Sequence, residues 1–373
     1  MAALGFAIDA AGLFASLSLS GAFDKPTPAE AKTNIQIILG SGERTTTAGG
    51  PRPHIALWDD GKYISYYGHR IGQYTPDKKK IKAGDQTNIV IEHTQTEPKH
   101  SQADPYYVML SQMDDDAICI SAVLVSNGKI SGAFYGDTGY KCGQSWFASE
   151  NRIGSDFEAP RCVWLDANHD NGINARAISF HLNDMQPNDD KLEQYYENLD
   201  TLCKSTPRFS FWGNLLPDAI PPMFKPRLKY KNGNGADEDL SKVLDDPEHP
   251  WDKGAYMAPK KVNKPKRRDV HVKRRSSNRN TGHLIISDQD TDVREICESE
   301  TSYGWDIVST KQKLFCDMEH KQLYPLCDTS VTTKCFDVDQ KTLAGAPGLD
   351  TRDEEVIKMR FGRSYNTTNV WKS

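Results

Sequence analysis

Residues 117–135 read AICISAVLVSNGKISGAFY, and this stretch predicts a β-hairpin more strongly than any other part of the chain. The runs Ala117–Val125 and Lys129–Tyr135 are rich in β-branched and small apolar residues, which suit strands. Between them stands Asn127-Gly128, a pair that readily adopts the positive φ angles of a tight hairpin turn. Two antiparallel strands are therefore expected here.

Similar short runs, separated by polar turns, fill most of the first half of the chain. The expected strands are Thr33–Leu39, His54–Trp58, Lys62–Tyr67, Thr87–His93, Tyr106–Leu110, Arg161–Leu165 and Ala175–Leu182. The turn Asp59-Asp60-Gly61 predicts a second hairpin. Strands at this spacing are typical of an antiparallel β-sandwich, so a mainly β fold is expected, with the sandwich and its attachments in residues 30–230.

One helix and one proline-rich segment follow the last of these strands. Apolar residues recur at helical spacing within Asp189–Cys203, and Asn188 or Asp189 can cap the first turn. The next stretch, LLPDAIPPMFKPRLKY at 215–230, cannot continue a helix because of its prolines. It predicts an extended strap over the sandwich, with the expected anchors Phe209, Phe211, Trp212, Leu215, Leu216 and Phe224.

The first 23 residues, MAALGFAIDAAGLFASLSLSGAF, contain no Lys or Arg and a single acidic residue, Asp9. As a helix they would reach about 34 Å, enough to cross a bilayer core of about 30 Å. Three interpretations of residues 1–25 stay open: a secretory signal, a membrane-inserting or oligomerising helix, and a buried helix. The missing basic n-region weakens the first, and the cost of placing Asp9 in lipid weakens the second.

The cysteines indicate disulfide bonds. Four lie in the first part of the chain and four in the last: Cys119, Cys142, Cys162, Cys203, Cys297, Cys316, Cys327 and Cys335. None forms a CxxC pair, and the even division suits two disulfides in each half and an oxidising compartment. The alternative is a set of reduced cysteines in the cytosol. The density of the last four predicts a small disulfide-rich β unit at 281–340, with a tail at 341–373 that carries a glycosylation sequon at Asn366.

Residues 231–280 differ in composition from the rest, with an acidic half followed by a basic half and few aliphatic side chains. This composition predicts a disordered linker. The basic runs end at Arg268 and Arg275, which are candidate cleavage sites for a kexin-type protease. In a cytosolic protein the same runs would instead indicate a nuclear signal or a polyanion-binding patch, and a solvated segment without a role is the third interpretation.

Two motifs resemble sites that carry chemistry. Cys142-Gly143-Gln144-Ser145 is similar to the nucleophile box of papain-type proteases, but it follows an expected strand, so a disulfide cysteine in the core is favoured. Asp166, Asn168 and Asp170 place oxygen ligands at alternate positions, as in a calcium loop. The loop lacks the glycine and the final acid of an EF-hand. A calcium site of another kind and an Asx-rich turn are the two interpretations, and no cofactor other than calcium is expected.

Two resemblances to known families add to these interpretations. The runs CVWLDANHDNGINARAISFHLNDM (162–185) and NLDTLCKSTPRFSFW (198–212) resemble a family of uncharacterised proteins from filamentous fungi, over most of residues 50–340. That resemblance implies no established activity. The order of segments in residues 33–147 is similar to that of PLAT and C2-like β-sandwiches, which implies binding to membranes or lipoprotein partners, in some cases through calcium.

Several functions remain compatible with the sequence. A net charge of −5 over 373 residues does not favour nucleic acid as a partner, and no residue is identified as catalytic. The leading interpretation is a secreted or membrane-active protein of toxin or effector type. Its sandwich would bind membrane lipid or a cell-surface glycan or protein, and residues 1–23 would allow homo-oligomers. One alternative is a secreted glycan- or protein-binding module, with the candidate stacking residues Trp58, Tyr63, Tyr66, Tyr67, Trp146 and Trp164. Further alternatives are a secreted hydrolase and an intracellular, membrane-associated protein.

Overall fold

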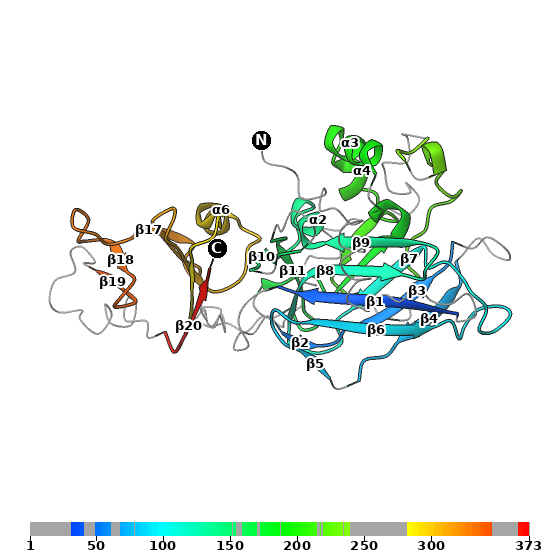
Figure 1. The fold of residues 1–373 in the computed structure, drawn as a ribbon, viewed down its shortest axis with the longest axis horizontal. Helices are drawn as coiled ribbons and strands as arrows, with labels where there is room; N and C mark the ends of the chain where they lie inside the picture. Colours follow the sequence, from blue (N-terminus) through cyan, green and yellow to red (C-terminus); the bar gives the residue numbers. More distant parts are fainter. Residues whose placement is uncertain are drawn as a thin grey trace, which may run out of the picture. The chain divides into compact units, whose positions relative to one another are not determined.

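The computed structural model describes residues 31–40, 49–60, 68–77, 79–150, 152–153, 159–169, 172–186, 188–214, 217, 219–233, 235–238, 282–344 and 365–372. The fold is mainly β, as expected (Figure 1). The chain divides into two compact units, one comprising Met1–His169 with Ile173–Val262 and the other Asp170–Gly172 with Asn263–Ser373. The predicted N-terminal helix (1–25) and the cleavage sites Arg268 and Arg275 lie outside the described residues.

The first sheet of the first unit contains the predicted hairpin. Its strand order is β10 (Trp146–Phe147), β11 (Cys162–Leu165), β8 (Ile118–Ser126), β1 (Lys32–Leu39) and β6 (Gln86–Glu92), with β9 (Ser131–Tyr135) also paired to β8. All of these pairs are antiparallel. Asn127 and Gly128 form the turn, because Gly128 has a φ of 83° and the Asn127 Oδ1 atom accepts the backbone N–H groups of Lys129 and Ile130. The hairpin prediction is confirmed.

The second sheet has the order β13 (Phe209–Trp212), β12 (Ala177–His181), β7 (Tyr107–Ser111), β3 (His54–Trp58) and β4 (Arg70–Tyr74), again antiparallel. β3 pairs with β4, whereas the sequence predicted a hairpin with Lys62–Tyr67, whose residues lie outside the described part. Two short strands, β2 (Gly50–Pro51) and β5 (Lys80–Ile81), form a separate pair.

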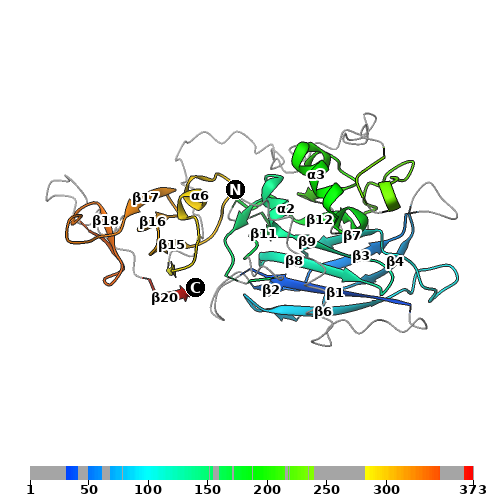
Figure 2. The same ribbon diagram turned by 45° about the horizontal axis from the view of Figure 1, so that its top comes forward.

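The two sheets pack face to face as an antiparallel sandwich (Figure 2). Phe134 on β9 lies 5.6 Å from Phe180 on β12 and 5.4 Å from Phe209 on β13, measured between ring centroids. Because side chains alternate along a strand, Ser179 and His181 on β12 must point to the opposite, outer face of the second sheet. That outer face is also covered, since all the residues of β3, β7, β12 and β13 are buried.

The proline-rich strap provides part of that cover. Met223 and Phe224 pack on a cluster of outer-face side chains: Ala56, Trp58, Tyr107 and Met109. The backbone N–H of Phe224 also donates to the Tyr107 hydroxyl oxygen at 2.9 Å. Of the expected anchors, Phe224 lies in the strap, Phe209, Phe211 and Trp212 belong to β13, and Leu215 and Leu216 lie outside the described residues.

The helical segments are short. They are α2 (Gly136–Lys141), η2 (Leu182–Met185), α3 (Asp189–Glu197), α4 (Asp200–Cys203), η3 (Lys231–Gly233) and α6 (Val293–Glu298). The predicted helix at 189–203 therefore forms with one interruption, because Asn198 adopts an extended conformation and its Oδ1 atom accepts the N–H of Asp200. Asn188 caps α3 as expected, with its side chain accepting the N–H of Lys191. None of the helices among the described residues is both long and apolar enough to span a membrane.

The second unit is built on a mixed five-stranded sheet. Its order is β17 (Gln322–Pro325), β16 (Leu314–Asp317), β15 (Asp306–Ser309), β14 (His283–Ser287) and β20 (Thr367–Trp371), with β14 parallel to both neighbours. A hairpin of β18 (Cys335–Asp337) and β19 (Thr342–Ala344) contributes Phe336 to a core with Leu284, Val308 and Phe315. β19 and β20 lie in the segment 341–373 that was expected to be a tail, so this segment supplies strands to the unit.

All eight cysteines form disulfide bonds, and each bond lies within one unit. The pairs are Cys119–Cys162, Cys142–Cys203, Cys297–Cys316 and Cys327–Cys335. The expectation of two disulfides in each half is confirmed. Four disulfides are consistent with an extracellular protein.

We predict that cleavage after Arg268 or Arg275 leaves no covalent link between the two units, because no disulfide joins them. The full chain would be treated with a kexin-type protease and its fragments resolved on a denaturing gel without reductant. Two separate fragments are expected. A single band that divides only after reduction would contradict the disulfide pairing.

A second prediction concerns His283, which is 2% exposed and packs edge-on against Trp305. Burial lowers the pKa of His283 to about 4, against an unfolded value of about 6.5. The unfolded chain therefore binds a proton that the folded unit does not, and the free energy of unfolding should fall by up to about 3 kcal/mol as the pH drops from 7 to 4. Urea unfolding of wild type and His283→Phe at both pH values measures how much of this fall in the free energy of unfolding comes from His283.

The substitution His283→Phe should remove that part of the pH dependence, whereas His320→Gln, at a half-exposed histidine of the same unit, should leave it unchanged. Equal pH dependence in wild type and His283→Phe would show that His283 does not cause the fall in the free energy of unfolding.

Candidate functional site

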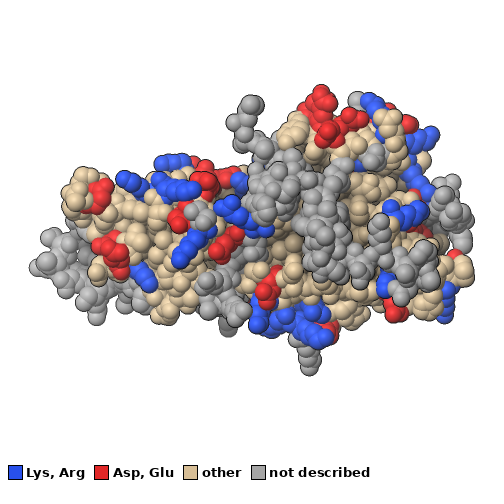
Figure 3. Space-filling view, in the orientation of Figure 1, with Lys and Arg blue, Asp and Glu red and all other residues tan. Residues whose placement is uncertain are grey.

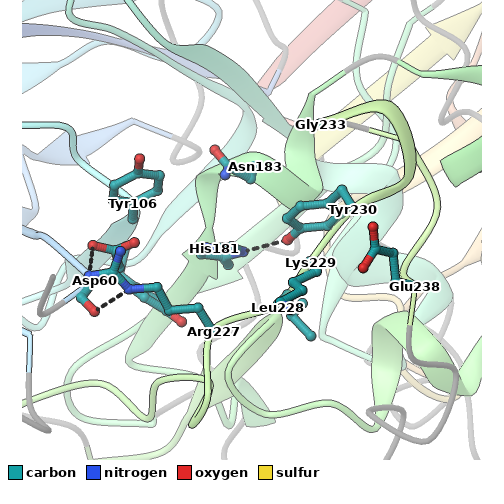
Figure 4. Close-up of a pocket in the computed structure, with 11 residues that line it drawn as sticks. Asp60, Tyr106, His181, Asn183, Arg227, Leu228, Lys229, Tyr230, Gly233 and Glu238 are labelled. Atoms are coloured by element: carbon teal, nitrogen blue, oxygen red, sulfur yellow. Dashed lines mark hydrogen bonds and ion pairs between the residues drawn. The ribbon is translucent and has the colours of Figure 1, made fainter.

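A cavity of about 410 Å³ lies on the outer face of the second sheet, where the strap crosses the ends of β7 and β12 (Figure 4). β7 contributes Tyr107 and β12 contributes His181, which are direct partners in the strand register and therefore share one face. Tyr106 precedes β7 at the rim, and the strap supplies Arg227 and Tyr230. The cavity thus has a rigid sheet for one wall and the strap for the other.

An ion pair joins the strap to the loop after β3 at the edge of this cavity. The Arg227 Nη2 atom lies 2.8 Å from the Asp60 Oδ1 atom, and the Arg227 Nε–H donates to the Asp60 backbone carbonyl at 3.2 Å. Burial raises the pKa of the Asp60 carboxyl despite the opposing effect of Arg227. Lys229 and Glu238 also line the cavity, so among its described residues other than histidine two acidic and two basic side chains balance to zero.

Behind the cavity, Arg208 holds two carboxylates in a fully buried cluster. Its Nη1 atom lies 2.6 Å from the Asp184 Oδ1 atom, and its Nη2 atom lies 2.5 Å from the Asp237 Oδ2 atom. The three side chains are at most 1% exposed. Gln194 on α3 completes the cluster, since its Nε2 donates to Asp237 Oδ2 and its Oε1 accepts the N–H of Asp237. The cluster therefore ties the residue before β13, η2, α3 and the segment that follows the strap together.

The cluster keeps Asp184 ionised. Burial alone would raise the pKa of this carboxyl, but Arg208 and the hydrogen bond from His181 outweigh it and hold the pKa well below its usual range. Lys191 supplies a second buried cation, with its Nζ donating to the Asn183 carbonyl and lying 4.5 Å from the centroid of the Tyr230 ring. Two carboxylates and two cations thus balance within the protein.

Asp184 fixes the proton position on His181. The His181 Nδ1 atom lies 2.8 Å from the Asp184 Oδ2 atom, and an ionised carboxylate can only accept. Nδ1 therefore carries the hydrogen, and in the neutral ring Nε2 is the acceptor. The Tyr230 hydroxyl donates to Asp184 Oδ1 at 3.0 Å, which fixes the carboxylate from its other oxygen.

Aromatic rings enclose the imidazole of His181. The rings of Tyr106 and Tyr230 lie roughly parallel to it, at centroid distances of 6.3 and 6.4 Å, and Tyr107 lies at 4.7 Å. Phe224 of the strap meets it edge-on at 5.8 Å. In the view of Figure 4, His181 stands between the Asp60–Arg227 pair and Tyr230. The arrangement offers ring faces for apolar contact beside hydrogen-bonding groups.

The structure places the predicted calcium ligands in a turn between β11 and β12. Asp166 is buried, and its Oδ1 atom accepts the backbone N–H of Asn168, as in an Asx turn. The Asn168 Nδ2 atom lies 3.5 Å from the Asp115 carbonyl oxygen, so this turn lies beside the loop between β7 and β8. Asp170 lies outside the described residues. Among those described, no group of three His, Cys, Asp or Glu side chains is placed to hold a metal ion.

Other sequence-based candidates are not among the described residues that line the cavity. Cys142 is in a disulfide with Cys203, and Ser145 is 3% exposed, which fits the core interpretation of that motif. Trp58, Trp146 and Trp164 are each at most 5% exposed, so their interpretation as stacking residues is wrong. Strand tryptophans of a sandwich pack in its interior or, for Trp58, under the strap. Tyr63, Tyr66 and Tyr67 lie outside the described residues.

Two further features concern the surface. Asn366 of the sequon is exposed just before β20, and its backbone N–H donates to the Gly282 carbonyl. Acidic side chains gather over α3 (Figure 3), where Asp189, Asp190, Glu193 and Glu197 are exposed.

No local sequence pattern indicates this cavity. The alternation along Ala177–His181 could have placed His181 on one face of its strand, but it does not show which strand lies beside it. The partners that define the site are distant in sequence, since Arg208 contacts residues 24 and 29 positions away. No local pattern records such pairings.

The buried cluster yields a stability prediction. Replacing Arg208 by Met leaves two buried carboxylates without their cation and should lower the free energy of unfolding by about 3–5 kcal/mol. Arg294→Met is the matched control, because Arg294 forms an exposed pair with Glu298 at 3.5 Å and should change stability by less than about 1 kcal/mol. Chemical unfolding of the full chain measures both. Similar losses in the two variants would contradict the role assigned to Arg208.

Comparisons with known proteins leave the function to be argued from this geometry: no family model, no curated protein and no solved structure matches the chain.

Proposed function

We propose that this is a secreted binding protein whose β-sandwich holds a carbohydrate in the cavity between the second sheet and the strap. The observation that carries the proposal is the lining of the cavity, where tyrosine rings alternate with hydrogen-bonding groups around His181. Sugars present C–H faces that pack on aromatic rings and hydroxyl groups that both donate and accept hydrogen bonds. The volume of about 410 Å³ falls in the range of small-molecule sites.

The charge balance of the lining favours a neutral sugar. Among the described lining residues, Asp60 and Glu238 oppose Arg227 and Lys229, so these side chains give no excess of one sign to attract an acidic or basic ligand. Carboxylate and guanidinium groups held in fixed positions accept and donate charge-assisted hydrogen bonds to hydroxyls. A neutral oligosaccharide at a cell surface is therefore the proposed partner.

Secretion is part of the proposal. The four disulfides support an oxidising environment, and the apolar N-terminal segment with its small residues supports a signal. Processing at Arg268 or Arg275 and glycosylation at Asn366 would fit the same route. Insertion into membranes and homo-oligomer formation depend on residues 1–23, outside the described part of the chain, and stay predictions from the sequence.

The proposal predicts binding of the full chain to neutral oligosaccharides on a glycan array. Tyr106→Ala removes a ring from the cavity rim, and Arg227→Met removes the guanidinium that faces Asp60. Each substitution should weaken binding at least about tenfold, corresponding to about 1.4 kcal/mol. Titration calorimetry with the best array ligand measures the change.

Tyr196→Ala serves as the control, since Tyr196 is 45% exposed on α3 and does not line the cavity. It should bind like wild type. An array without any carbohydrate signal, or losses of equal size in all three variants, would overturn the proposal.

A further inference from the structure

We propose that the cavity also hydrolyses esters, with His181 Nε2 as the general base that activates water against the acyl group of an O-acylated carbohydrate. This inference rests on the proposed function, because the sugar part of the substrate would occupy the same cavity. It adds a reaction and a substrate class to the binding role.

The first support is the orientation of the imidazole. Asp184 accepts the Nδ1 hydrogen of His181 at 2.8 Å and is itself fixed by Arg208 and by the Tyr230 hydroxyl. A carboxylate in this position holds one tautomer and stabilises the imidazolium that forms when Nε2 takes a proton. Such an arrangement is more than a core histidine needs for its own hydrogen bonds.

The second support is the availability of Nε2. His181 lines the cavity, and its hydrogen bonds within the described residues involve Nδ1 alone. The surrounding rings keep the imidazole in place without occupying that nitrogen. Nε2 is therefore an acceptor that a water molecule or a ligand hydroxyl in the cavity can reach.

The third support is the kind of nucleophile that the lining allows. Among the described residues that form the cavity, none is serine, threonine or cysteine. The hydroxyls of Tyr107 and Tyr230 are engaged, the first by the N–H of Phe224 and the second by Asp184. Burial raises the pKa values of both phenols, so neither readily becomes a phenolate. Burial also raises the pKa of Tyr106, the third tyrosine among the described lining residues, so water is the nucleophile that we assign.

The reaction balances with this one base. Nε2 takes a proton from water while the water oxygen bonds to the carbonyl carbon, and the carbonyl electron pair moves onto its oxygen. The Asn183 side-chain amide and the Arg227 guanidinium line the cavity and can donate to that oxyanion. The intermediate then expels the sugar alkoxide, which takes the proton back from Nε2. The products are a carboxylic acid and a free sugar hydroxyl.

The chemical groups in this cavity are suited to hydrolysing an ester bond. The imidazolium formed in the first step protonates the leaving alkoxide in the second, so no separate acid is needed. Glycosidic cleavage instead requires two carboxyl groups on opposite sides of the bond, one of which protonates the leaving oxygen. Of the two carboxylates among the described lining residues, Asp60 is already in an ion pair with Arg227.

The chain contains a matched control for this inference. His320 in the second unit makes the same kind of contact, from its Nδ1 to Asp317 Oδ2 at 2.9 Å and three residues apart. Its side chain is 50% exposed, and it lies in a different unit from the cavity. If orientation by a carboxylate and exposure to solvent were sufficient for ester hydrolysis, His320 would hydrolyse esters as well as His181 does.

The test measures acetate release by the full chain from triacetin and from O-acetylated xylo-oligosaccharides. His181→Asn keeps a donor near the Nδ1 position and removes Nε2, and it should reduce the rate at least about 100-fold. His320→Asn should leave the rate unchanged. The unfolding temperatures of both variants report on folding separately from the reaction.

Either of two results would overturn the inference. The first is binding of the acetylated oligosaccharide by wild type without acetate release above that of a heat-denatured sample, which needs no variant to fold. The second is unchanged acetate release in His181→Asn. Both leave the carbohydrate-binding proposal standing, whereas failure to bind any sugar would remove the basis of both proposals.

Discussion

The buried contacts of Arg208 with Asp184 and Asp237 are the constraint on which the rest of the first unit depends. Charged groups leave water at a cost of several kcal/mol each, so they remain buried only when the partners fit closely. Here the three side chains come from the residue before β13, from the turn after β12, and from the segment that follows the strap. The ion pairs therefore determine where the strap ends relative to the sheet, and with that the shape of the cavity.

The apolar side chains on the outer face of the second sheet explain why a strap covers that face. An antiparallel sheet in a sandwich commonly leaves its outer face to water, with polar side chains along it. In this protein the outer face of the second sheet carries Trp58, Tyr107 and Met109, which are too apolar for such a surface. Covering them requires another segment, and the strap brings Phe224 for the apolar part and Arg227 and Tyr230 for the polar part. The cavity is the place where the cover is incomplete.

The sequence predicts those features that depend on local patterns. The hairpin at Asn127-Gly128, the strand at Ala177–His181 and the cap at Asn188 follow from turn preferences, alternation and capping, which act over a few residues. The division of the disulfides follows from the distribution of the cysteines. By contrast, the pairing of β3 with β4, the contacts of Arg208 and the accessible Nε2 of His181 depend on which segments become neighbours in space. Strand alternation also cannot tell a buried face from an exposed one, so it does not show that Trp146 and Trp164 are buried.

The central claim, that the ligand binds between the second sheet and the strap, is tested most directly by hydrogen–deuterium exchange of the full chain with and without a neutral oligosaccharide. A ligand in the cavity should slow exchange of the backbone amides in residues 223–233 and 181–186, which surround it. The second unit should exchange at the same rate in both samples. Protection confined to the second unit, or to the far sheet around β1 and β6, would contradict the account and place the binding site elsewhere.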